Sequence, residues 1–163
     1  IAPHFTMKRQ LDDYYEKYYH KLANRSALLK EDDNAAMRSL ASWKFRMIRN
    51  WDGIEIVDVI LPNPTNDVLN LGDIFNAELI LNLGVIAPDD IMIEMILGQK
   101  VNDHMVEPQS IFELHLTTVD GNLAHFVIEV ETPLAGVFDF AFRVTPKNPL
   151  LPHRMDFNLV KWA

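Results

Sequence analysis

The sequence predicts an α+β fold, in which an N-terminal helical hairpin precedes an antiparallel immunoglobulin-like β-sandwich of about seven strands. Apolar residues recur every three or four positions in the first 50 residues and every second position afterwards. The later segments are short and separated by turn residues, with no long helical pattern between them, which argues against a parallel sheet. We therefore divide the chain into a helical segment, residues 1–52, and a sandwich domain, residues 53–163.

The first helix is expected over residues 6–29, with Thr6 as its N-cap. An acidic run at 31–33 breaks the pattern, and a second helix is expected from about 34 to 50. A pair of helices buries too little surface to be stable alone, so we expect it to dock on other protein surface. The apolar stripe of the first helix is the candidate interface, and it contains four tyrosines: Tyr14, Tyr15, Tyr18 and Tyr19.

Strand signals follow from residue 54 onward. Phe75, Ala77 and Leu79 predict one buried face. The intervening Asn76 and Glu78 predict the solvent-facing side of the same strand. Seven strands are expected, at 54–61, 75–83, 91–97, 110–118, 122–130, 138–144 and 155–162.

One hairpin, around Gly121, permits a prediction of register. A two-residue Asp-Gly turn would place His125 among apolar neighbours. A three-residue loop with Gly121 in the left-handed region pairs Leu114 with Phe126 instead. We favour the second register because it keeps one consistent apolar face. It also makes His115 and His125 a cross-strand pair on the opposite face.

That histidine pair is the one ligand-like arrangement that the sequence suggests. Two imidazoles with a carboxylate from Glu113 or Glu129 could hold a metal. We favour the plainer interpretation, an exposed polar pair on a sheet face, and expect no metal. The sequence has no Cys, no Gly-x-Ser-x-Gly motif and no phosphate-binding glycine loop, so we expect no catalytic residue and no cofactor site in this chain.

Three tryptophans are candidates for stacking on sugar rings: Trp43, Trp51 and Trp162. Trp43 lies on a helical apolar stripe and is expected in the core. Trp51 is expected to pack at the junction of helix and sandwich, and Trp162 to anchor the C-terminal end. Sugar binding by these rings is kept as the alternative.

Composition restricts the remaining function classes. Residues 1–50 carry ten Lys or Arg and six Asp or Glu, a net +4, and residues 51–163 carry five and seventeen, a net −12. An acidic sandwich is a poor nucleic-acid binder, because phosphate contacts require clustered basic residues. No apolar run is long enough for a spanning helix, so no membrane partner is expected. The chain begins at Ile1 without Met, which we interpret as a segment of a longer protein.

Two stretches, residues 5–15 and 143–157, with the closing residues 159–162, resemble the C-terminal region of bacterial α-glucan phosphorylases of the glycogen or maltodextrin type. That resemblance implies a cytoplasmic parent enzyme that uses pyridoxal phosphate, bound to a lysine, to release glucose 1-phosphate from α-1,4-glucan. The chain shows no match to the family's cofactor-lysine segment.

The resemblance implies that this chain is a non-catalytic domain with a structural or assembly role. Its expected partners are the missing catalytic domains of the same polypeptide, with α-glucan or a second copy of the chain as further options. A carbohydrate-binding module and a metal-binding domain at His115 and His125 are the alternatives.

Overall fold

The computed structural model describes residues 6–61, 72, 74–101, 104–131 and 138–163. The chain forms two compact units, Ile1–Phe45 and Arg46–Ala163, and each is described by itself. Within the described ranges, no helix combines the length and the apolar character that crossing a bilayer requires.

The helical unit begins with α1 (Met7–Tyr14), continues through one π-helical turn, η2 (Tyr15–Tyr19), and enters α2 (His20–Asn50). The predicted N-cap is confirmed, because Thr6 Oγ1 accepts a hydrogen bond from the Arg9 backbone N–H at 3.3 Å. This bond satisfies one of the backbone donors that a helix start leaves free. The first helix therefore begins where the sequence predicts.

The predicted break at residues 31–33 is confirmed, and it takes the form of a kink between two helical segments of α2. Glu31 is extended, with ψ 155°, and the next three residues have positive φ: 48° at Asp32, 53° at Asp33 and 62° at Asn34. Asp and Asn tolerate this left-handed region better than other non-glycine residues. Arg38 Nη1 donates to Asp33 Oδ2 at 3.3 Å just after the bend. The acidic run thus interrupts the helix through its backbone conformation.

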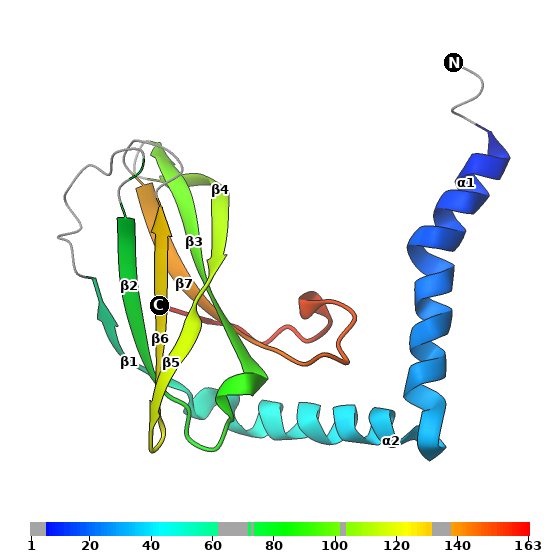
Figure 1. The fold of residues 1–163 in the computed structure, drawn as a ribbon, viewed down its shortest axis with the longest axis horizontal. Helices are drawn as coiled ribbons and strands as arrows, with labels where there is room; N and C mark the ends of the chain where they lie inside the picture. The colour runs from blue at the N-terminus through cyan, green and yellow to red at the C-terminus, as the bar shows by residue number, and fades with distance from the viewer. Residues whose placement is uncertain (1–5, 62–71, 73, 102–103, 132–137) are drawn as a thin grey trace. The chain divides into compact units, whose positions relative to one another are not determined.

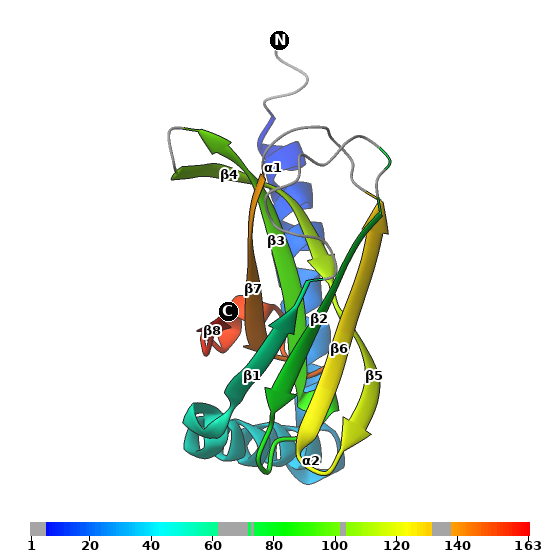
Figure 2. The same ribbon diagram turned by 90° about the vertical axis from the view of Figure 1, so that its left-hand side faces the viewer.

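In the described part of the second unit, eight strands form two four-stranded antiparallel sheets (Figure 1). One sheet has the order β1-β2-β6-β5, and Figure 2 shows these strands side by side. The other has the order β4-β3-β7-β8. The bounds are β1 Glu55–Ile60, β2 Ile74–Asn82, β3 Ile91–Val101, β4 His104–Glu113, β5 His115–Asp120, β6 Leu123–Glu131, β7 Phe138–Pro146 and β8 Lys161–Trp162.

This strand order has immunoglobulin-like topology. Strands β1-β2-β6-β5 take the places of the A, B, E and D strands, and β3, β7 and β8 those of C, F and G, with β4 as an added edge strand beside C. The strand pairs among the described residues are all antiparallel, and β2–β6 and β3–β7 join segments distant in sequence. The predicted α+β class with an antiparallel immunoglobulin-like sandwich is confirmed; the predicted helical hairpin is not, since the N-terminal helix continues across a kink at residues 31–34.

The core lies between the inner faces of the two sheets. Ala77, Leu79 and Leu81 of β2 are at most 2% exposed, whereas the intervening side chains are half-buried. Phe142 and Val144 supply the same kind of face on β7. Period-two burial is therefore confirmed in these strands.

The end of α2 belongs to the sandwich unit. Met47, Trp51 and Ile54 are all at most 4% exposed. Arg46 Nη2 lies 2.9 Å from Asp90 Oδ2, an ion pair with the short 3-10 turn before β3. Buried apolar side chains and this ion pair thus attach the last helical turns to the strands.

The predicted strand over 110–118 is wrong, because it is divided between the two sheets. β4 ends at Glu113 and β5 begins at His115. Leu114, buried at the crossing, donates its backbone N–H to Ile93 O at 2.9 Å. The continuous period-two pattern could not reveal the crossing, since both halves are strand.

The predicted strand over 155–162 is also largely wrong. Arg154–Asp156 forms a 3-10 turn, and only Lys161–Trp162 pairs as a strand. Phe142 N and Ala163 O are 2.9 Å apart, and the reciprocal bond is 3.0 Å. The backbone forms a short turn at the start of residues 155–162, so only the last residues of this range pair with β7.

The predicted hairpin register is wrong. Asp120 faces Leu123, so the loop has two residues, with Gly121 at φ 59°. Its left-handed conformation was expected, but a three-residue loop was not observed. His115 and His125 do not face each other, because each has a different partner on the neighbouring strand.

The error arises at the turn, because the pairing of Asp120 with Leu123 already differs from the predicted register there, and a β-bulge then changes the pairing by one residue within β5. Leu116 faces Phe126 while Thr118 faces His125, so Thr117 has no partner of its own in the pairing. One extra residue in β5 changes the register along the hairpin. Uniform pairing from the turn therefore gives wrong partners for the first half of β5.

Candidate functional site: an exposed aromatic helix face

The first helix exposes an apolar face. No side chain in α1 or in the π turn is buried. A soluble protein seldom leaves so many large apolar groups on one element without a partner. Seven such residues are between 47% and 70% exposed: Met7, Leu11, Tyr14, Tyr15, Tyr18, Tyr19 and Leu22, here called the aromatic face.

The spacing of the tyrosines and the π turn keep the rings close together. Tyr14 and Tyr18 are four residues apart, with ring centroids 5.9 Å from each other. The His20 backbone N–H bonds to Tyr15 O, five residues earlier, which is the bond of a π turn. The rings of Tyr15 and His20 are consequently 5.7 Å apart. The result is a broad surface of rings.

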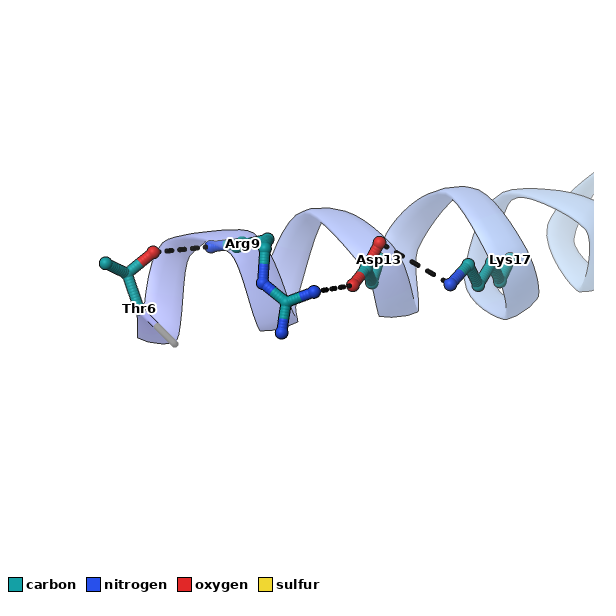
Figure 3. Close-up of polar contacts among 4 residues, drawn as sticks. All are labelled: Thr6, Arg9, Asp13 and Lys17. Atoms are coloured by element: carbon teal, nitrogen blue, oxygen red, sulfur yellow. Dashed lines mark hydrogen bonds and ion pairs between the residues drawn. The ribbon is translucent and has the colours of Figure 1, made fainter. Parts of the chain in front are cut away.

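A chain of ion pairs follows α1 into the π turn (Figure 3). Arg9 Nη1 lies 3.3 Å from Asp13 Oδ2, and Lys17 Nζ lies 3.6 Å from Asp13 Oδ1. Each exposed pair contributes about 0.2–0.5 kcal/mol to helix stability. By helical spacing these three residues lie away from the aromatic face, so the helix is amphipathic.

The three tryptophans differ in their surroundings. Trp43 and Trp51 are both 4% exposed, so their rings are unavailable to a sugar. Trp162 is 54% exposed, and its ring centroid lies 5.8 Å from Arg143 Cζ. A cation beside an indole ring at this distance is a favourable contact. Trp162 is therefore the one tryptophan with a ring open to solvent.

Trp162 ends a polar row that crosses the second sheet. Glu113 faces Glu94, Glu94 faces Arg143, and Arg143 faces Trp162 on successive strands. Arg143 donates to Glu94 Oε2 from Nε at 3.1 Å and from Nη2 at 2.6 Å. Glu113 in turn pairs with Lys147 at 2.7 Å. Sequence reasoning missed this row because cross-strand partners depend on the register.

His115 and His125 are not arranged as a metal site. His125 Nδ1 lies 2.6 Å from Glu78 Oε1 on β2, so the imidazole has a carboxylate partner within its own sheet. His115 is exposed at the start of β5. The described part of the chain contains no group of three side chains suited to holding a metal ion.

Among the residues that the structure describes, no lysine has surroundings that fit pyridoxal phosphate, the cofactor that the resemblance implies for a parent enzyme. None of the lysines whose side chains are described is buried. A Schiff-base lysine is ordinarily desolvated, which lowers its pKa and makes the amine nucleophilic. No step of cofactor chemistry is therefore assigned to these residues.

A cleft of about 380 Å³ opens where the chain crosses between the sheets. Leu116 and Phe126 supply part of its apolar wall. Glu113, His115 and Lys147 contribute polar groups. The cleft's lining residues include no Trp or Tyr, and their one Phe, Phe126, is buried.

By its fold the chain is an immunoglobulin-like sandwich that carries an amphipathic helix. Residues 51–163 match the glycogen phosphorylase C-terminal domain family, and the chain therefore belongs to that family. It is 30% identical to a maltodextrin phosphorylase of Thermococcus litoralis over 99% of its length. It is 28% identical to glycogen phosphorylases of Mycobacterium tuberculosis and Mycobacterium bovis over its whole length. The chain spans 19% of the length of each of these relatives.

Proposed function

We propose that this chain is a non-catalytic domain of an α-glucan phosphorylase and that the aromatic face attaches it to the catalytic part of the same polypeptide. The parent reaction would be phosphorolysis of α-1,4-glucan to glucose 1-phosphate, with pyridoxal phosphate held outside this chain, in the cytoplasm. The observation that carries the proposal is the helix over Met7–Tyr19, which has an apolar face and no buried side chain.

Two arguments support the catalytic part of the same polypeptide as the partner of the aromatic face. Helices owe most of their stability to the packing of their apolar face, so the aromatic face needs a protein partner to remain ordered. The relatives align over essentially the whole chain, including the helix that precedes the family match at residue 51. The helix is therefore common to proteins about five times longer, whose remaining length offers the surface to cover it.

Amide hydrogen exchange in the full-length enzyme tests the proposal. Residues 7–22 are expected to exchange slowly in the enzyme and fast in the isolated 163-residue chain. The double change L11E and Y15E adds two negative charges to the aromatic face and should remove the protection. R9E makes the same change in net charge on the polar side and should leave protection intact. Fast exchange of this helix in the unaltered enzyme, or equal exchange in both variants, would rule out docking.

A second candidate function, glucan binding, is favoured by the exposed ring of Trp162. Rings open to solvent beside polar side chains can stack on the apolar face of glucose units. Isothermal titration of the chain with maltoheptaose should give saturable heat that W162A abolishes. V160A, also at an exposed apolar position close to the C-terminus, is the matched control. Absence of heat at millimolar sugar would reject this function.

A further inference from the structure

The edge strand β5 of the first sheet has an unpaired side. Its strand neighbour is β6, and in the described part of the chain no other strand pairs with it. All six residues of β5, His115–Asp120, are exposed. Unpaired backbone donors and acceptors on such an edge can pair with another strand.

The bulge at Thr117 gives this edge an unusual apolar character. Residues three apart on a regular strand point to opposite faces. Here Leu116 faces Phe126 and Val119 faces Ala124, both of which are buried, so Leu116 and Val119 lie on the inner face together. They are nevertheless 42% and 50% exposed, respectively.

The open cleft lies behind this strand, with Leu116 and Phe126 in its wall. The inner face of the first sheet is therefore incompletely covered at β5. An added strand beside β5 would place its own side chains next to Leu116 and Val119 and continue the inner face.

The sequence of β5 is complementary to itself in antiparallel pairing. When two copies of His-Leu-Thr-Thr-Val-Asp run in opposite directions, His115 faces Asp120, Leu116 faces Val119, and Thr117 faces Thr118. These are an imidazole–carboxylate pair, an apolar pair and a hydroxyl pair, and polar or apolar partners of this kind are favourable across strands. Both strands carry the same bulge, so their backbone spacing also matches about the two-fold axis.

We infer that β5 is a self-association edge, through which two copies of this chain join their first sheets across a two-fold axis. The other edge of the same sheet lacks this property. Self-pairing of β1 would place Glu55 against Ile60 and Asp58 against Val57, so carboxylates would face apolar side chains. Self-complementary pairing is therefore a property of the β5 edge that the β1 edge lacks. This inference is independent of how the aromatic face is covered.

Exchange of the two residues His115 and Asp120 tests the pairing directly. Sedimentation velocity of the 163-residue chain, from micromolar to several hundred micromolar, should show a reversible dimer. H115D places two carboxylates opposite each other and D120H places two imidazoles, and each should weaken the dimer about tenfold. The double variant H115D/D120H restores the pair in reversed order and should recover most of the affinity. These positions lie at opposite ends of one strand, so recovery requires a second copy.

Replacement of an apolar residue of β5 by a charged one supplies a second test of the dimer. L116E should weaken the dimer at least as strongly as H115D. V57E changes a residue of similar exposure, 52%, on the opposite edge strand of the same sheet, and should leave the dimer unchanged. Circular dichroism of each variant establishes that the sandwich is folded. A chain that stays monomeric throughout the range, or a dimer that these changes on β5 do not weaken, overturns the inference.

Discussion

Glu94 and Arg143 form a nearly buried ion pair in the second sheet, in which two guanidinium nitrogens donate to one carboxylate oxygen at 3.1 and 2.6 Å. The two side chains are 7% and 19% exposed. Because both charges have left water, each depends on the other for compensation. The pair therefore constrains how β3 and β7 lie together.

Removing the cation should strongly destabilise the sandwich. R143M leaves the carboxylate of Glu94 buried without its guanidinium partner, and a loss of about 3–5 kcal/mol is expected. Urea unfolding followed by tryptophan fluorescence measures it. K147M removes the exposed pair with Glu113, in which both side chains are more than 40% exposed, and should cost less than about 1 kcal/mol. Equal losses in the two variants would contradict the assigned role of burial.

Two adjacent residues at the end of α2 should respond very differently to truncation. Met47 is fully buried, so M47A creates a cavity and should cost about 2–5 kcal/mol in free energy of unfolding. Ile48 is 57% exposed, and I48A should cost less than about 1 kcal/mol. Thermal unfolding of both variants in parallel makes the comparison. A small effect of M47A would mean that the end of the helix is not part of the sandwich core.

The turn between β5 and β6 should require glycine because of its backbone conformation and not because of limited space for a side chain. Gly121 has φ 59°, and no atom lies within 4 Å of where a Cβ would be. G121A therefore introduces strain without a clash and should cost about 1 kcal/mol. G53A, at an equally open position without positive φ, should be neutral or slightly stabilising. Chemical denaturation of the two variants decides between a conformational and a steric origin.

The bend in the long helix should be relieved by glycine. Asp32 has φ 48°, a conformation that costs a side-chain-bearing residue about 1 kcal/mol. D32G should therefore stabilise the bend, whereas D32V, with a β-branched side chain, should disturb it. The helical circular dichroism signal during thermal unfolding reports both changes. A higher melting temperature for D32V than for D32G would contradict the left-handed geometry.

Local patterns predicted the parts of this fold that depend on burial. The alternation around Leu79 and the N-cap at Thr6 both follow from the residues nearest in sequence. Period two reports that a segment is extended and has one buried side. The same alternation does not indicate which of the two sheets a segment joins, so the crossing between the sheets at Leu114 was missed.

The polar contacts of the sandwich were harder to predict, because they depend on partners far apart in the chain. The position of the two-residue turn at Gly121 separates His115 from His125, because it pairs His125 with Thr118 and leaves His115 opposite Val127. Glu94 and Arg143 meet because β3 and β7 are neighbours, although 49 residues separate them. The aromatic face was recognisable because its residues lie within a few helical turns.

The distance along the chain between paired strands has a consequence for biosynthesis. β2 pairs with β6, and β3 pairs with β7, so each sheet requires a strand from the second half of the domain. A ribosome that has finished β3 has released strands whose central partners do not yet exist. Apolar residues such as Leu79 and Ile93 therefore stay exposed until the later strands have been synthesised. During this interval the nascent chain is vulnerable to misassembly and benefits from chaperones.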